Sequence, residues 1–475
     1  MRLLEILIFI FLGLGLLRLL IASIQGKFRS PWFEIGTLIL IACHLILEGY
    51  RWQMLPGYAL TLLLLAINWF SSRSNRQIKW SRWWSLLSAV LIGTLYLGSI
   101  LLPTLLPVPR ITPPSGPYAV GTRTWHWIDE TRIDPYAPTA GESREIMVQA
   151  WYPINPEDQD KRSPWMAAAE IVAPAVAEWI DLPPFFLDHL VYVTTQATLD
   201  APIASRELGF PVLLFSHGFG GFRAQNTNQM QYLASHGFIV IAAEHTYASV
   251  VSVFPDGHIA LHNPDTLPDD LPPAEDIMAA RALGDQWASD LSFVLDQLST
   301  GNLGEDHTAW HAAIDLENIG AFGHSTGGGA AIEFCNRDHR CRATLTMDPF
   351  VKPVSAEAME QGLPHYALHM FSEVWTSSEN LDRFIILAQR SDVKPLIVNI
   401  RGSDHYDFSD LPLLTPLAHA IGLKGPIKGA RMTEIVNKYL LAYFEQALAG
   451  KQSDLLRGET VEYPEVIYTP PAGSP

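Results

Sequence analysis

The segment AFGHSTGGGA, residues 321–330, places Ser325 between two glycines and follows it with a run of small residues. The residues before Ser325 form a short apolar run typical of a buried strand, and GGGAAIEF after it is typical of a helix. We therefore predict that Ser325 lies at a strand-to-helix turn, where a Gly-x-Ser-x-Gly pattern exposes the serine hydroxyl beyond the end of the strand. Such a serine is a candidate nucleophile. The alternative is a glycine-rich turn without a chemical role.

The chain around this segment alternates between short apolar runs and amphipathic stretches of helical periodicity. Near-continuous apolar strands separated by helices are typical of a mostly parallel sheet that is covered on both faces. Residues 118–450 are therefore predicted to form an α/β domain, which is long enough to bury a sizeable core. The predicted strands are residues 118–128, 144–153, 211–218, 238–245, 318–325, 343–349 and 395–402.

Two further polar residues directly follow predicted strands. Asp348 ends the run ATLTM, and His405 lies in GSDHYDFSD after the run PLIVNI. Because the carboxyl ends of parallel strands meet at one edge of a sheet, Ser325, Asp348 and His405 are expected to lie together as nucleophile, acid and base. Alternatives stay open at two positions, namely Asp404 or Asp407 in place of Asp348, and His365 or His369 in place of His405.

The segment FSHGFGGFR, residues 215–223, predicts an oxyanion hole. A strand ends there in His-Gly, so that the backbone N–H of Phe219 can act together with that of Thr326, the residue after the candidate nucleophile. We interpret the neighbouring His217, and His245 at the end of the next predicted strand, as structural residues beside the site.

Residues 1–107 are predicted to be a transmembrane region. A helix needs roughly 20 apolar residues to cross a bilayer, which the first and last of four apolar stretches supply and the middle two reach with their flanks. Four transmembrane helices are expected, with two as the fallback. The stretches are residues 3–24, 33–47, 55–70 and 84–106.

The basic residues between these stretches predict which side of the membrane each loop faces. Cytoplasmic loops carry an excess of Lys and Arg, and here the first and third loops are the basic ones. With four helices, residues 112–475 are then expected to be extracytoplasmic at a cell membrane. The residues concerned are Lys27 and Arg29 in the first loop, and Arg73, Arg76, Lys79 and Arg82 in the third.

Three other segments have a composition of their own. Residues 108–117 are rich in proline and are interpreted as a linker between the membrane region and the α/β domain. Residues 164–205 are apolar but broken by prolines, which favours a helical cap over the sheet, or alternatively a lid that meets lipid. Residues 451–475 are expected to be a C-terminal tail, whose last dozen residues, with PPAGSP, are expected to be loose.

The charge and the cysteines limit the partners and the compartment. The chain carries 32 Lys and Arg against 49 Asp and Glu, a formal net charge of −17, with the acidic excess after residue 111. Because an acidic domain repels phosphate groups, no nucleic-acid partner is expected. Cys335 and Cys341 bracket a short polar stretch and are predicted to form a disulfide in an oxidising compartment, with two unpaired thiols as the alternative.

These motifs resemble those of the plasma-type platelet-activating factor acetylhydrolases and their bacterial relatives over most of residues 115–447. The likeness rests on YAVGTRTW, QAWYP, FSHGFGGFR, AAEHTYAS, GHSTGGGA, Asp348 and GSDHYDFSD. It implies an α/β-hydrolase fold and a serine esterase without metal or cofactor that acts on short or oxidised acyl chains, phospholipids included. It also implies a triad of Ser325, Asp348 and His405. Thr326 departs from the phenylalanine common in the animal enzymes, and the secreted members lack the apolar N-terminal region.

The sequence therefore predicts a membrane-anchored serine carboxylic ester hydrolase whose partners are an ester or phospholipid substrate and the lipid bilayer. An alternative within enzymes is a general esterase, lipase or polyester hydrolase of the same fold. An alternative from another class is a non-catalytic membrane interaction protein that kept the hydrolase fold. The complete set of Ser325, Asp348 and His405 favours the enzyme, because binding alone does not require it.

Overall fold

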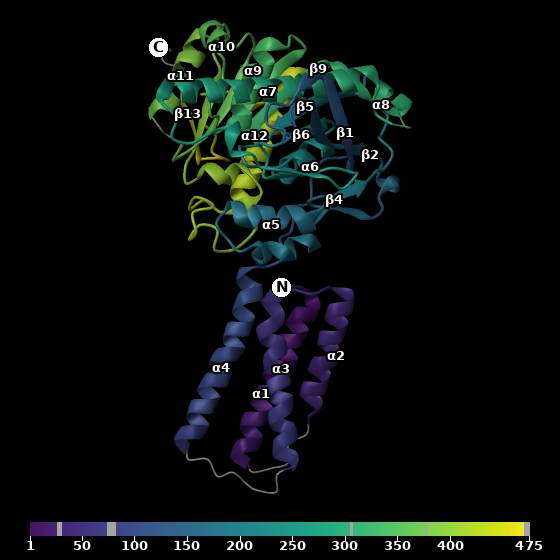
Figure 1. The fold of residues 1–475 in the computed structure, drawn as a ribbon, viewed down its shortest axis with the longest axis vertical. Helices are drawn as coiled ribbons and strands as arrows, with labels where there is room; N and C mark the ends of the chain where they lie inside the picture. The colour runs from purple at the N-terminus through teal and green to yellow at the C-terminus, as the bar shows by residue number, and fades with distance from the viewer. Residues whose placement is uncertain (26–30, 74–81, 305–306, 376–377, 470–475) are drawn as a thin grey trace. The chain divides into compact units, whose positions relative to one another are not determined.

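The computed structural model of the chain describes residues 1–25, 31–73, 82–304, 307–375 and 378–469. These residues divide into two compact units. The helical unit is Met1–Pro109 together with Asp188–Leu190 and Leu414–Leu417, and the second unit contains the remaining residues. Figure 1 labels the helices of both units and some strands of the second unit.

Each of the four predicted apolar stretches forms a helix. Among the described residues, one helical segment, Trp52–Phe70, is long and apolar enough to cross a membrane, and Trp32–Leu47 and Val90–Leu105 are shorter apolar helices. The prediction of four transmembrane helices therefore stays a prediction. The helices are α1 (Leu3–Gln25), α2 (Trp32–Leu47), α3 (Leu55–Arg73) and α4 (Arg82–Leu105), with the short 3₁₀ helix η1 (Trp52–Met54) before α3.

Polar side chains tie the helices of the first unit to one another. The carboxylate of Glu5 on α1 accepts a hydrogen bond from the guanidinium of Arg51 at 2.8 Å, and both side chains are fully buried. The amide of Asn68 on α3 donates to the carboxylate of Glu34 on α2 at 2.7 Å. Because a buried charge is tolerated only with partners, these contacts fix how the helices pack inside this unit.

The second unit is built on an eleven-stranded sheet in the order β13-β12-β11-β10-β9-β5-β6-β2-β1-β4-β3 (Figure 1). Its centre is parallel, because the pairs from β6 through β5, β9, β10 and β11 to β12 all run in the same direction. The strands are β1 (Ala119–Ile133), β2 (Ser143–Ile154), β3 (Arg162–Pro164), β4 (Thr194–Leu199), β5 (Phe210–Ser216), β6 (Ile239–Glu244), β9 (Ile314–His324), β10 (Cys341–Met347), β11 (Ala367–Ser372), β12 (Leu396–Ile400) and β13 (Val466–Thr469), and a separate hairpin pairs β7 (Val251–Val253) with β8 (Ile259–Leu261).

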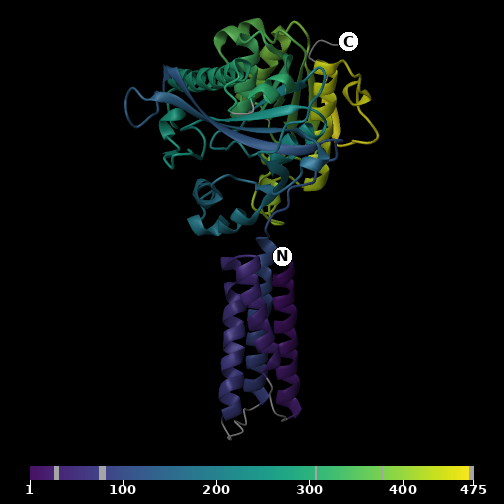
Figure 2. The ribbon, with the colours of Figure 1, turned by 90° about the vertical axis from the view of Figure 1, so that its right-hand side faces the viewer.

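Helices lie on both faces of this sheet (Figure 2). Helices α7 and α9 pack against each other and against β5, while α6 and α12 pack against each other and contact other strands. The predicted α/β architecture of this unit is thus confirmed. The helices are α5 (Ala169–Trp179), α6 (Thr227–Ser235), α7 (Pro273–Thr300), α8 (His307–Ala313), α9 (Thr326–Arg337), α10 (Ala356–Gln361), α11 (Ser378–Arg390) and α12 (Gly429–Ala449), with a 3₁₀ segment η3 (Pro184–Tyr192).

Two predicted segments contain strands that were not expected from the sequence. The expected cap, residues 164–205, contains helix α5 but also strand β4, which pairs with β1 and extends the sheet. The expected loose tail contains strand β13, which pairs antiparallel with β12. In both places β-branched and aromatic residues find a free sheet edge, and that edge lies far away along the sequence.

One central strand was missed. Strand β11 lies between β10 and β12, although its sequence ALHMFS carries His369 in the middle of the run. The structure shows why a buried strand tolerates this residue: the His369 imidazole lies 2.7 Å from the hydroxyl of Thr346 on β10. A paired polar group inside a strand gives no apolar pattern to recognise.

Candidate active site

Ser325 occupies the sharp turn between β9 and α9. Its backbone has φ 54° and ψ −122°, a conformation that residues with side chains rarely adopt and that concentrates at functional sites. The flanking glycines make the turn possible. A Cβ on Gly323 would lie 2.1 Å from the carbonyl oxygen of Gly327, and one on Gly327 would lie 2.1 Å from that of Ser216 on β5.

Asp348 leaves the sheet beside Ser325. Strands β9 and β10 pair as far as His324 and Met347, and the Ser325 N–H donates to the Met347 carbonyl at 3.0 Å. Asp348 also has a positive φ, 45°, and is fully buried. Its carboxylate accepts hydrogen bonds from the N–H and the O–H of Ser372, both at 2.6 Å. Burial raises the pKa of Asp348 above its usual range, and the hydrogen bonds from Ser372 oppose that shift.

His405 reaches Asp348 from the loop after β12. Its Nδ1–H donates to Oδ2 of Asp348 at 3.1 Å, which leaves Nε2 as the ring atom that can accept a proton. The side chain keeps 15% of its surface exposed, whereas Asp348 keeps none. Burial lowers the pKa of His405, so the imidazole is neutral near pH 7. A neutral, oriented imidazole is what a general base requires.

Two aromatic rings that the sequence reasoning missed hold His405. The indole of Trp375 stacks on the imidazole, with ring centroids 4.0 Å apart and planes 14° from parallel. The ring of His324 lies 4.5 Å from His405, and its Nε2–H donates to the His405 carbonyl at 3.0 Å. His324 belongs to the serine motif itself and ends a buried strand, which was a usable signal. Trp375 lies in a stretch without regular pattern and gave none.

The alternative residues have other roles. Asp407 accepts the backbone N–H groups of Asp404 and Gly425, at 2.9 and 2.6 Å, and so shapes the loop of His405. His365 contacts Thr344, and His369 lies within β11. The structure thus pairs Asp348 with the His405 ring.

The predicted oxyanion loop lies beside Ser325. A Cβ added to Gly218 would be 3.5 Å from Cβ of Ser325, so the peptide that carries the Phe219 N–H borders the nucleophile. Thr326 is the first residue of α9 and is 3% exposed, and first-turn N–H groups have no partner within their own helix. Trp179, at the end of α5, contacts the ring of Phe219 with centroids 6.0 Å apart.

A second serine, histidine and aspartate are linked behind this loop. The Ser216 hydroxyl donates to Nε2 of His245 at 2.8 Å, and Nδ1–H of His245 donates to Asp290 at 2.9 Å. We call these three residues the inner group. All three are fully buried, and Arg144 binds Asp290 at 2.7 Å. His217 lies next to them, its ring centroid 5.1 Å from that of His245.

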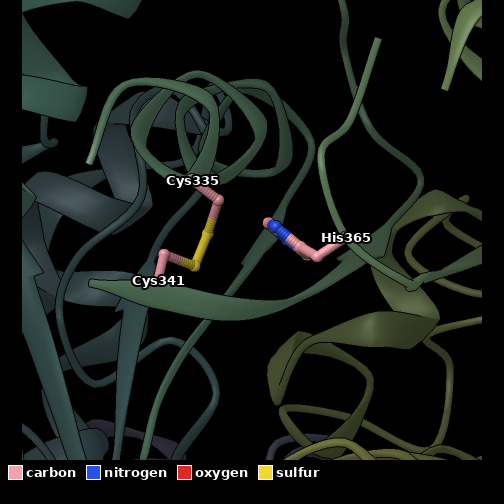
Figure 3. A group of neighbouring side chains, drawn as sticks. All are labelled: Cys335, Cys341 and His365. Carbon is pink, nitrogen blue, oxygen red and sulfur yellow. A yellow bond between two sulfur atoms is a disulfide. The ribbon is translucent and has the colours of Figure 1, made fainter. Parts of the chain in front are cut away.

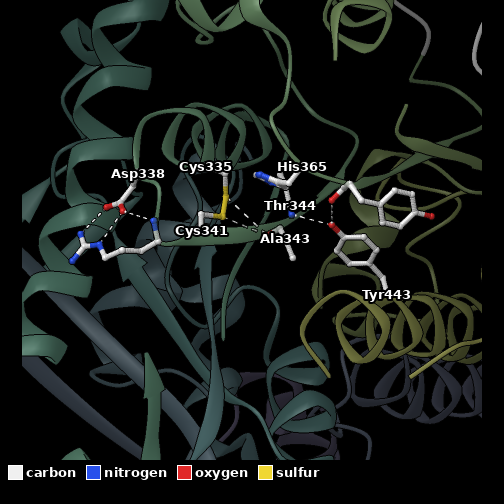
Figure 4. The surroundings of a disulfide bond; sticks show 9 residues. Cys335, Asp338, Cys341, Ala343, Thr344, His365 and Tyr443 are labelled. Atoms are coloured by element: carbon white, nitrogen blue, oxygen red, sulfur yellow. Dashed lines mark hydrogen bonds and ion pairs between the residues drawn. A yellow bond between two sulfur atoms is a disulfide. The ribbon is translucent and has the colours of Figure 1, made fainter. Parts of the chain in front are cut away.

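The predicted disulfide joins Cys335 near the end of α9 to Cys341 at the start of β10 (Figure 3). His365 lies close enough to both sulfurs to make a three-ligand group, but a disulfide has no thiolate to offer a metal ion. Figure 4 shows the neighbouring hydrogen bond from Thr344 N–H to the hydroxyl of Tyr443, which ties β10 to α12. The disulfide therefore joins α9, which follows Ser325, to β10, which precedes Asp348.

Comparison with known proteins places this geometry in a family. The family described as platelet-activating factor acetylhydrolase, isoform II, matches residues 107–261 and 302–461. The platelet-activating factor acetylhydrolase of Cavia porcellus is 27% identical over 271 residues, which are 54% of this chain and 61% of that protein. The chain thus spans about three fifths of that relative's length.

Two further relatives cover more of their own length. A probable 1-alkyl-2-acetylglycerophosphocholine esterase of Arthroderma benhamiae is 25% identical over 75% of this chain and 92% of that protein. The solved structure of a ferulic acid esterase from Streptomyces cinnamoneus is 28% identical, with a TM-score of 0.64, and covers 76% of this chain and all of the other. All three relatives are named as hydrolases of esters, the predicted class of enzyme. Since the family match covers more than half of its residues, the chain belongs to the platelet-activating factor acetylhydrolase, isoform II, family.

Proposed function

We propose that the chain is a serine carboxylic ester hydrolase that cleaves short-acyl or lipid esters. The hydrogen bond between His405 and Asp348, at the edge of the sheet where the strained turn of Ser325 lies, carries the proposal. A single carboxylate that orients one neutral imidazole beside a serine is the arrangement that activates a hydroxyl for attack on a carbonyl.

The proposed reaction uses this chain's own residues in two steps. Nε2 of His405 takes the Ser325 proton while the serine oxygen attacks the ester carbonyl, and the N–H groups of Phe219 and Thr326 bind the developing oxyanion. The protonated His405 then donates its proton to the leaving alcohol, which yields an acyl-enzyme on Ser325. Water, deprotonated by His405, attacks the acyl group and releases the acid.

The substrate class follows from the relatives and from the surroundings of Ser325. Two of the relatives are named for acetyl esters of phospholipids and one for esters of ferulic acid. Trp179 and His262 lie against Phe219, with Trp179 and His262 centroids 4.7 Å apart. These three rings lie together beside the oxyanion loop. They favour a compact acyl group, whether acetyl or aryl, over a long chain.

A fluorophosphonate probe tests the enzyme proposal on the full chain in detergent. We expect labelling at Ser325 and none in Ser325→Ala, together with hydrolysis of acetyl esters faster than of palmitoyl esters. A feruloyl ester of the same alcohol tests the second substrate class. A folded wild-type protein that takes no label at Ser325 would contradict the proposal. It would favour the alternative, a non-catalytic membrane interaction protein with the hydrolase fold.

We also propose that residues 1–107 anchor the chain in a membrane with the second unit on the extracytoplasmic side. The four apolar helices and the Cys335–Cys341 disulfide support this, since disulfides persist in oxidising compartments. Of the basic residues that predicted the orientation, Lys27, Arg29, Arg76 and Lys79 lie outside the described residues. The test is a fusion after residue 112 to a reporter that is active only in the cytoplasm. Activity of this reporter would overturn the orientation.

A further inference from the structure

The peptide between Gly218 and Phe219 is held in one orientation from the side of its carbonyl. The Gly218 oxygen accepts a hydrogen bond from Nδ1–H of His217 at 2.7 Å and another from the Gly221 N–H at 2.9 Å. Because a trans peptide is planar, its N–H points opposite to its C=O. The Phe219 N–H therefore points away from the His217 ring.

We propose that His217 is a positioning residue that aims the Phe219 N–H at the oxyanion formed on Ser325. The proposal rests on the esterase function proposed above. A Cβ built on Gly218 would lie 3.5 Å from Cβ of Ser325, which places this peptide at the nucleophile. His217 itself is fully buried, so it acts through the peptide and touches no substrate.

The surroundings of His217 fix its tautomer. Its Nε2 accepts the backbone N–H of His245 at 3.2 Å, so Nδ1 carries the ring proton and can donate to Gly218. Burial lowers the pKa of His217 to about 3, which keeps the ring neutral at physiological pH. The inner group holds the His245 ring through Ser216 and Asp290, and so keeps its backbone N–H in place.

Other contacts hold the loop without setting this peptide plane. The Gly220 N–H donates to the Ala248 carbonyl at 3.0 Å, and the Val250 N–H donates to the Gly221 carbonyl at 2.9 Å. These bonds lie after the 218–219 peptide and leave its rotation to the two donors on the Gly218 oxygen. Of these two donors, His217 is the one that a side-chain substitution can remove.

Two matched variants separate positioning from structural support. In His217→Asn the amide nitrogen occupies the place of Nδ1 and still donates to Gly218, whereas in His217→Gln the amide oxygen occupies the place of Nε2 and accepts only the His245 N–H. Each variant keeps one of the two hydrogen bonds. Both are measured in the full chain, with Ser325→Ala as the inactive control, for kcat and KM on a short acyl ester and for the midpoint of thermal unfolding.

We expect His217→Gln to lose about tenfold or more in kcat with KM within about twofold, since an oxyanion donor acts in the transition state. His217→Asn should stay within about threefold of the wild-type kcat at a similar unfolding midpoint. Equal losses of kcat in both variants, or a loss in neither, would overturn the positioning role. If the wild-type protein is inactive and a fluorophosphonate probe does not label Ser325, the proposed esterase function itself is contradicted.

A measurement on the wild-type protein covers the case in which neither variant folds. Ring-¹⁵N histidine and carbonyl-¹³C glycine in the full chain give a solid-state NMR dipolar coupling for the His217 to Gly218 hydrogen bond. The proposal requires that the coupled ring nitrogen carries a proton. An unprotonated coupled nitrogen, or no coupling at hydrogen-bond distance, would refute it.

Discussion

The candidate active site and the inner group contain the same three residue types with different surroundings. In the first, Ser325 and His405 lie at the end of the sheet, and His405 keeps 15% of its side chain exposed. In the inner group, Ser216, His245 and Asp290 are linked by two short hydrogen bonds and are fully buried. The two groups therefore differ in how far their side chains are accessible to a substrate, and not in the types of residue that they contain.

The charge on the aspartate is the second difference. Burial by itself would raise the pKa of Asp290, but Arg144 and the His245 ring outweigh it and lower the pKa below its usual range. Asp348 has hydrogen bonds from Ser372 instead of an arginine, and burial raises its pKa. Asp290 thus forms an ion pair with Arg144, whereas in the proposed reaction the Asp348 carboxylate would stabilise the imidazolium of His405.

The largest effect is expected from Asp348→Asn. The amide cannot stabilise the imidazolium and favours the wrong tautomer of His405, so kcat should fall by about 10³ to 10⁴ while the fold is kept. Steady-state kinetics with an acetyl ester measure the loss, and circular dichroism checks the fold. A loss below about tenfold in a folded variant would mean that another group orients His405.

Arg144→Met should act on stability instead. It leaves Asp290 and Asp134 buried without their shared guanidinium, and breaking a buried pair costs about 3 to 5 kcal/mol of unfolding free energy. Arg342→Met is the control, because Arg342 and its partner Glu317 are both exposed and such pairs contribute about 1 kcal/mol or less. Urea unfolding followed by fluorescence compares them. Equal stability of the two variants would show that the inner group is not held by charge.

The pH dependence of kcat/KM should report the hydrogen-bonded pair of His405 and Asp348. Burial lowers the pKa of His405, so we expect the base to stay neutral below the ordinary histidine value of about 6.5 and the acidic limb to lie below that pH. Beneath the limb, activity falls about tenfold per pH unit. Unfolding of Ser325→Ala over the same pH range separates protonation from acid denaturation. A limb at pH 7 or above would contradict the assignment.

The smallest effect is expected from Ser216→Ala, the counterpart of Ser325→Ala. It removes a hydroxyl from the inner group and leaves Nε2 of His245 without that donor, which costs about 1 to 3 kcal/mol of stability. Ser325 should still take the fluorophosphonate label in this variant. Loss of labelling in folded Ser216→Ala protein would show that the reactivity of Ser325 depends on the inner group as well.

The sequence was informative where the chemistry depends on local pattern. The glycines around Ser325 and the apolar runs before Asp348 and His405 are short-range signals, and each marks a strand end that the structure contains. In the inner group, Asp290 had no such signal. Arg144 on β2 and Asp290 on α7 are 146 residues apart and meet because α7 packs on the sheet. Trp375 is recognisable only from its stacking on His405.

Strand β13 makes the C-terminal segment a part of the central sheet. It covers the outer side of β12, the strand that leads to His405, and Glu465 just before it binds Arg431 on α12. A premature stop codon before Val466 would expose the unpaired N–H and C=O groups of β12, which can then pair with the same edge of another molecule. Truncation at a place far from Ser325 in sequence would thus replace the short edge strand β13 by β12 as the edge of the sheet.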